Sequence, residues 1–171
     1  TLTKVAQFNR AMGLAFDLQG FRFVADSENQ AIRQVDLEGD LVSTYISEGL
    51  ELPVDLMFDP VNNLYVVDET AGKVLKFDLF GNQTAVWAGL TQPTAIALTP
   101  SRNLVVTEFG GTLFLFENGT GDFSVADGTI LAEGLVEPRG LAVLEDGLIV
   151  ISDSRSEERR VGKEGRSRWS P

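Results

Sequence analysis

Short apolar runs alternate with turn-forming residues along most of the chain, and this pattern repeats about every 40 residues. The run MGLAFD, which begins at Met12, returns as VDLMFD from Val54, as TAIALT from Thr94 and as RGLAVL from Arg139. A single unit of this size cannot bury its own apolar face and must stack on its neighbours. The repeat therefore predicts an all-β protein built from similar units packed side by side.

Within one unit, the pattern predicts four antiparallel strands. The apolar runs of the second unit are Leu56–Phe58, Leu64–Val67, Val74–Phe77 and Thr84–Ala88. Segments rich in Asp, Asn, Gly and Pro separate these runs, and such residues favour tight turns. Four strands joined by three turns describe one blade of a β-propeller.

The strand count predicts only part of a propeller, about three and a half blades within residues 1–154. The expected divisions are an outer strand of a preceding blade at 1–8, blades at 11–49, 52–89 and 92–134, and a half blade at 137–154. Because propellers usually close with about four to eight blades, we expect a truncated ring. Self-association of two copies through their exposed terminal blades would close it as a homodimer, and closure by one copy with four blades is the alternative.

The last segment, 155–171, breaks the pattern. Its sequence RSEERRVGKEGRSRWSP has no strand alternation and no blade turn. It resembles the translated read-through of a sequencing adapter seen at the ends of metagenomic sequences, with Gly165 where that translation has cysteine. We therefore expect 155–171 to be a non-native tail, and the fourth unit to be cut in mid-blade.

Three stretches of the first unit resemble a known repeat. They are FNRAMGLAFD at 8–17, FVADSEN at 23–29 and IRQVD at 32–36, and they are similar to the NHL repeat. The likeness covers about residues 5–154 and implies a propeller of the superfamily that includes SMP-30 and gluconolactonase. NHL propellers serve as binding scaffolds, whereas gluconolactonase-like relatives are metal-dependent enzymes.

Composition and charge narrow the classes of partner. Residues 1–154 hold 8 Lys and Arg against 22 Asp and Glu, so this part repels phosphate backbones and nucleic acid is not expected as a partner. No apolar stretch approaches the roughly 18 residues of a membrane-spanning helix, so no membrane partner is expected either.

The chain has no His and no Cys, which excludes Ser-His-Asp and Cys-His catalysis and His-ligated metals within one chain. With no recognisable catalytic motif, the sequence favours a scaffold that binds a protein or a small molecule. The alternative is a lactonase or hydrolase that uses a divalent metal held by carboxylates.

One acidic residue closes the second strand of every unit. Circular symmetry would place these four side chains in a ring, where carboxylates could bind calcium or another divalent cation. The other interpretation, which we favour because every unit repeats the feature, is that each acid accepts backbone N–H bonds in its own blade turn. The residues are Asp26, Asp68, Glu108 and Asp153.

The start of each innermost strand is the second candidate site, because these strands line the central channel of a propeller. Met12, Thr94 and Arg139 hold this position in three units, and Asp55 follows it in the second, where the NHL pattern usually has glycine. Arg139 and Asp55 could anchor a carboxylate or a sugar at the channel mouth, or pair with each other. The resemblance to gluconolactonase implies a metal bound there by a Glu, two Asn and an Asp. The residues at the start of the four innermost strands offer none of these; they are Met12, Val54, Thr94 and Arg139.

Overall fold

A computed structural model of the chain describes residues 8–37, 42–117, 122–154 and 156–161, the last of these as backbone only. The expected outer strand at 1–8 and most of the tail therefore lie outside the described residues. Within the described residues, the secondary structure consists of strands and two single turns of 3-10 helix, Ser27–Asn29 and Val125–Asp127. None of the described residues forms a helix long and apolar enough to cross a membrane.

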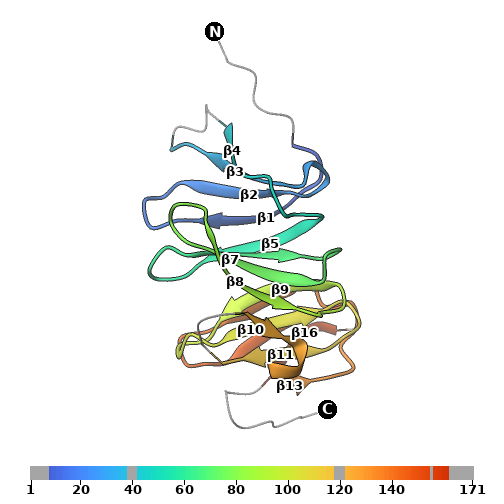
Figure 1. Cartoon of the computed structure of the whole chain (residues 1–171). Helices are drawn as coiled ribbons and strands as arrows, with labels where there is room; N and C mark the ends of the chain where they lie inside the picture. The colour runs from blue at the N-terminus through green and yellow to red at the C-terminus, as the bar shows by residue number, and fades with distance from the viewer. Residues whose placement is uncertain (1–7, 38–41, 118–121, 155, 162–171) are drawn as a thin grey trace.

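The strands form four sheets that follow one another along the chain, and we call them blades 1 to 4 (Figure 1). Blade 1 contains β1 (Ala11–Phe16), β2 (Arg22–Asp26), β3 (Ala31–Val35) and β4 (Val42–Ile46). Blade 2 contains β5 (Pro53–Phe58), β6 (Leu64–Asp68), β7 (Lys73–Phe77) and β8 (Gln83–Ala88). Blade 3 contains β9 (Pro93–Leu98), β10 (Leu104–Glu108), β11 (Leu113–Phe116) and β13 (Thr129–Ala132). Blade 4 contains β14 (Gly140–Val143), β15 (Ile149–Asp153) and β16 (Ser156–Val161).

The four-stranded antiparallel blade predicted from the repeat is confirmed in blades 1 to 3. Each of these blades is an antiparallel meander in which consecutive long strands pair, from β1 to β4, β5 to β8 and β9 to β13. All four apolar runs expected in the second unit lie within β5 to β8. The turn residues act as expected: Asp59 Oδ1, for example, accepts bonds from the N–H groups of Val61 and Asn63.

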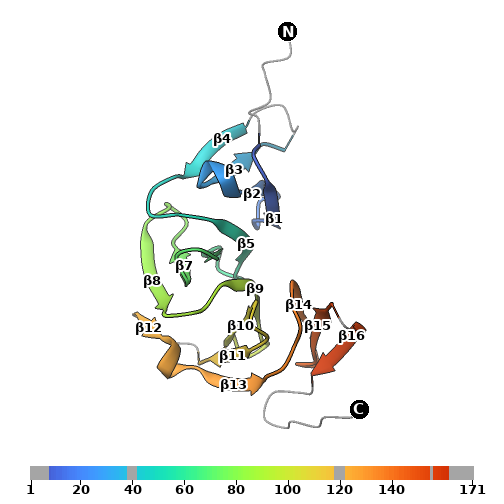
Figure 2. The same cartoon turned by 90° about the vertical axis from the view of Figure 1, so that its right-hand side faces the viewer.

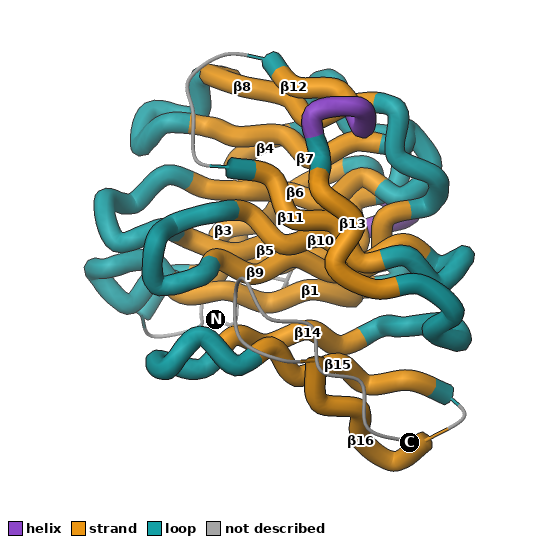
Figure 3. Tube along the Cα trace, turned by 90° about the horizontal axis from the view of Figure 1, so that it is seen from below, coloured by secondary structure: helices purple, strands orange, loops and turns teal. Residues whose placement is uncertain are grey.

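The four blades are arranged in an open arc. Figure 2 shows β1, β5, β9 and β14 on the inner side of the arc, and β4, β8 and β13 on its outer side. Viewed from below, the loops gather at two opposite sides of the sheets (Figure 3). This is the arrangement of a propeller, in which the innermost strands surround a channel and the loops form its two faces.

Blade 4 differs from the sequence-based expectation. The strand pattern was expected to end at Ser154, yet the backbone of Ser156–Val161 pairs antiparallel with β15 and gives this blade a third strand. Pairing of this kind needs only backbone N–H and C=O groups, which an unpaired strand edge offers to any extended segment. The pattern of side chains therefore cannot predict this strand.

Blade 3 holds the longest connection within a blade, between β11 and β13. Part of it, β12 (Phe123–Ser124), pairs parallel with β8 of blade 2 and makes that sheet five-stranded. The ring of Phe123 stacks on the indole of Trp87, with centroids 5.3 Å apart and an angle of 5° between the planes. The connection thus helps to join blade 3 to blade 2.

The hydrophobic core lies between the blades. Three clusters of buried side chains follow one another along the arc, each formed by one face of a blade and the opposite face of the next. Phe23 of blade 1 packs with Leu56 and Val66 of blade 2 in the first of these clusters. Blade-to-blade contact is thus the main way in which this chain buries apolar surface.

Candidate functional site

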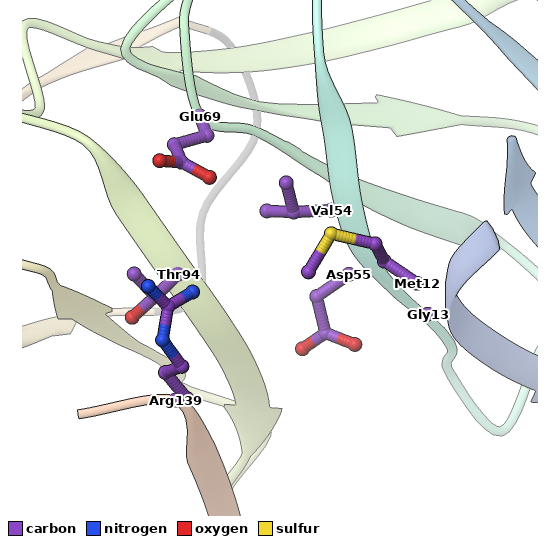
Figure 4. Close-up of a pocket in the computed structure, with 7 residues that line it drawn as sticks. All are labelled: Met12, Gly13, Val54, Asp55, Glu69, Thr94 and Arg139. Carbon is purple, nitrogen blue, oxygen red and sulfur yellow. The ribbon is translucent and has the colours of Figure 1, made fainter. Parts of the chain in front are cut away.

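A pocket of about 170 Å³ lies where the innermost strands of the four blades begin (Figure 4). Every blade contributes to its wall. The lining residues are Met12, Gly13, Val54, Asp55, Glu69, Thr94 and Arg139.

The structure brings together all four residues that the sequence places at the channel mouth. Met12 is 42% exposed and Arg139 is also exposed, whereas Thr94 is buried and Asp55 is mostly buried. Because each comes from a different blade, they meet only through the curvature of the arc. That they bind a ligand stays a prediction.

The Asp55 carboxylate joins two blades. Its Oδ1 accepts a bond from the N–H of Leu56 at 2.9 Å, and its Oδ2 accepts one from the N–H of Ile96 at 3.0 Å. Ile96 lies on β9, which pairs within its sheet only with β10, so Asp55 satisfies a donor on the free edge of an innermost strand. Burial raises the pKa of Asp55 to about 6, against the opposing effect of these two hydrogen bonds.

Arg139 does not pair with Asp55, one of the alternatives that the sequence left open. Its guanidinium lies over the ring of Phe109, with Cζ 5.3 Å from the ring centroid. Among the described residues, Arg139 forms no ion pair. The aromatic ring thus orients a cation at the wall of the pocket without neutralising its charge.

The hydroxyl of Thr94 forms its hydrogen bonds within the protein. It donates to the carbonyl of Pro138 at 2.7 Å and lies 3.0 Å from the Thr107 hydroxyl. Pro138 precedes Arg139, so this bond ties the start of blade 4 to the innermost strand of blade 3. Thr94 therefore forms the pocket wall and positions Arg139.

Gly13 allows the innermost strands of blades 1 and 2 to approach closely beside the pocket. A Cβ atom at this position would lie 2.8 Å from Asp55 Cα and 2.7 Å from Leu56 Cδ2. Any larger residue would push the two strands apart.

Sequence reasoning missed two residues at this site, Glu69 and Phe109. Glu69 lines the pocket, and Phe109 supports Arg139. Both directly follow the repeated acid of their blade, at a position that holds Ser27 and Ser154 in the other two blades. The change of residue at an otherwise equivalent position is the signal that could have found them.

The structure does not gather the four repeated acids into one cluster; among the described residues, no three acidic side chains are grouped so that they could hold a metal ion. Each of the four accepts a hydrogen bond from a backbone N–H 17 residues earlier in the chain, in the segment that enters its own blade just before the innermost strand. The bonds are Asn9 to Asp26 at 2.6 Å, Glu51 to Asp68 at 2.7 Å, Thr91 to Glu108 at 2.6 Å, and Val136 to Asp153 at 3.1 Å. The acids are therefore backbone acceptors, the interpretation favoured from the sequence. The donor that all four share lies in the segment that enters the blade, and Asp68 also accepts a bond from the N–H of Ala71 in its own blade turn.

The surroundings of these acids also differ from blade to blade. Burial pushes the pKa of Asp26 upward, but bonds from Asn29, Arg33 and the N–H of Asn9 outweigh it and hold the pKa below its ordinary value. Burial raises the pKa of Glu108, partly offset by the bond from Thr91. Within the described part of the chain, no three acidic side chains come close enough to hold a metal ion.

The comparisons with known proteins establish the fold. No protein-family model matches the chain. A curated relative, Protein SUPPRESSOR OF QUENCHING 1, chloroplastic, from Arabidopsis thaliana, is 28% identical over 49% of this chain and 10% of that protein. Virginiamycin B lyase from Staphylococcus aureus superposes with a TM-score of 0.67 at 12% identity, over 96% of this chain and 58% of that one. A chain of a nidogen/laminin complex superposes with a TM-score of 0.69 at 20% identity, over 90% of this chain and 64% of that one.

These solved structures are β-propellers, which agrees with the all-β blades and identifies the fold of this chain as a β-propeller. The chain spans less than two thirds of each of these matched proteins. At such identities the likeness is one of fold, and function has to be argued from the pocket.

Removing the acid of blade 2 should destabilise the protein. The buried Asp68 carboxylate accepts bonds from the N–H groups of Glu51, Leu52 and Ala71, so Asp68→Ala leaves three donors without this acceptor. We expect a loss of about 3 kcal/mol in unfolding free energy, measured by urea denaturation. Glu145→Ala, on an exposed turn, is the control. A loss below about 1 kcal/mol for Asp68→Ala would show that the acid is not needed to hold the blade.

The buried Asp55 should make stability depend on pH. Its pKa of about 6 in the folded protein exceeds the ordinary value of 3.8 for an Asp side chain, so the folded state keeps the proton up to a higher pH than the unfolded state does. Unfolding free energy must then fall as pH rises through this window. Between about pH 4.5 and pH 7, the unfolding free energy of the wild type should fall by about 2 kcal/mol more than that of the Asp55→Asn variant. Equal pH profiles for the two proteins, with Glu145→Gln as control, would contradict the burial of this charge.

Proposed function

We propose that the chain is an NHL-type propeller that acts as a binding scaffold, and that its pocket holds a small ligand bearing a carboxylate and hydroxyl groups. The observation that carries this proposal is Arg139, an oriented guanidinium at the pocket wall with no ion-pair partner among the described residues. A guanidinium binds a carboxylate through two parallel N–H bonds, which favours this ligand group over a neutral one.

The other lining residues indicate which further groups the ligand carries. Asp55 and Glu69 supply carboxylate oxygens, which accept bonds from hydroxyl groups, while Met12 and Val54 supply apolar surface. A pocket of about 170 Å³ is smaller than the roughly 300 to 1,000 Å³ of sites for drug-sized molecules. A single sugar acid fits this combination of size, charge and polarity.

Glucuronate is a suitable probe, with glucose as its uncharged counterpart. Isothermal titration calorimetry should detect binding of glucuronate, and glucose should bind at least about tenfold more weakly because it lacks the carboxylate. Arg139→Gln should weaken glucuronate binding by about tenfold or more, whereas Arg102→Gln, on the exposed turn between β9 and β10, should not change it. If the Arg139 variant bound glucuronate as the wild type does, the role given to this guanidinium would be wrong.

A metal-dependent hydrolase is not supported by the residues at the pocket. Only Asp55 and Glu69 offer carboxylates there, and both oxygens of Asp55 already accept backbone bonds. We therefore expect calcium, zinc or manganese at about 1 mM to leave the melting temperature unchanged. A rise of several degrees with one of these ions, lost in Asp55→Asn, would instead favour the hydrolase.

A further inference from the structure

One face of blade 1 exposes apolar side chains that alternate along its innermost strand. Leu14 is 56% exposed and Phe16 is 58% exposed. Val24, which lies opposite Leu14 in the pairing of β1 with β2, is half-buried on the same face. A contiguous apolar sheet face of this kind is unusual on an isolated protein surface.

The equivalent face of every other blade is covered. The pairs that correspond to Leu14 and Val24 all lie in the clusters between blades, where the preceding blade packs on them. These pairs are Leu56 with Val66, Ile96 with Val106, and Leu141 with Ile151. The face of blade 1 therefore has the chemistry of a blade-to-blade contact, but among the described residues no blade packs on it.

Blade 4 presents the other half of the same contact. Ala142 pairs with Val150 across β14 and β15, and Ala142 is exposed while Val150 is half-buried. In blades 1 to 3 the residues equivalent to Val150 are fully buried and pack on the next blade in the same three clusters. They are Phe23, Tyr65 and Val105. One chain thus carries both complementary faces, one at each end of the arc.

We propose that a second copy of this chain covers both faces. The blade 1 face of each copy packs on the blade 4 face of the other, and the two arcs close a ring of eight blades around a two-fold axis. Eight is within the range of about four to eight blades found in closed propellers. The curvature of the arc, with all innermost strands on its inner side, directs the two ends toward such a closure (Figure 2). This inference does not depend on the proposed ligand.

Light scattering coupled to size exclusion tests the proposal on the full 171-residue chain. We expect twice the mass of one 18.6 kDa chain, independent of loading concentration above the dissociation constant. The mass of a single chain would overturn the proposal. So would a mass that keeps rising with concentration, because head-to-tail contacts that do not close produce open polymers.

Substitutions at either end should separate the two copies. Leu14→Glu places a charge on the blade 1 face, and Ala142→Glu does so on the blade 4 face; both residues are exposed in the single chain, so each variant should fold. We expect either variant to raise the dissociation constant by about 100-fold or more, with an unchanged far-UV circular dichroism spectrum.

Phe80→Glu is the matched control. Phe80 is 79% exposed but lies on the turn between β7 and β8, away from both faces. The Phe80→Glu variant should therefore keep the mass of two chains. If Phe80→Glu dissociated the protein as fully as Leu14→Glu, or if neither Leu14→Glu nor Ala142→Glu did so, the two faces would not be the contact.

Discussion

Burial of each blade against the next is the interaction on which the rest of this structure depends. A single four-stranded sheet has two faces and cannot cover either of them by itself. In this chain neighbouring blades pack face to face, and the three core clusters are the contacts between blades 1 and 2, 2 and 3, and 3 and 4. The curvature that follows from stacking twisted sheets then gathers residues at the starts of the four innermost strands around one pocket.

A second interaction keeps the blades in register. The buried acid at the end of each second strand binds the N–H of a residue 17 positions earlier, in the segment that enters the blade. The N–H of the residue after the acid adds a bond to a carbonyl of the same entering segment in all four blades. In blades 2 and 3 the N–H of Glu69 donates to Leu52 O, and that of Phe109 donates to Gln92 O. Glu69 and Phe109 are therefore held by their backbones at the channel mouth, which leaves their side chains to line or support the pocket.

Much of the fold follows from the sequence because its causes are local and repeated. The runs that became β5 to β8 could be predicted from apolar alternation and turn residues, since each depends on its immediate neighbours. The strand at Ser156–Val161 could not be, because backbone pairing with β15 creates it. The positions of Met12, Asp55, Thr94 and Arg139 around one pocket follow from the repeat register. Their partners do not: the contact of Asp55 with Ile96 crosses from one blade to the next, and no local pattern encodes it.

The same repetition also separates residues that build the protein from those that could give it a ligand. A side chain that recurs in every blade, such as the acid at Asp26 and Asp68, accepts a bond from the equivalent backbone N–H each time and so serves the fold. Specific recognition of a small molecule needs positions that differ between equivalent sites. At the channel mouth there are two such positions: the one that Met12, Val54, Thr94 and Arg139 share at the start of the innermost strand, and the residue after the repeated acid. Arg139 and Glu69 stand at these two positions, where the other blades carry mainly apolar or hydroxyl side chains.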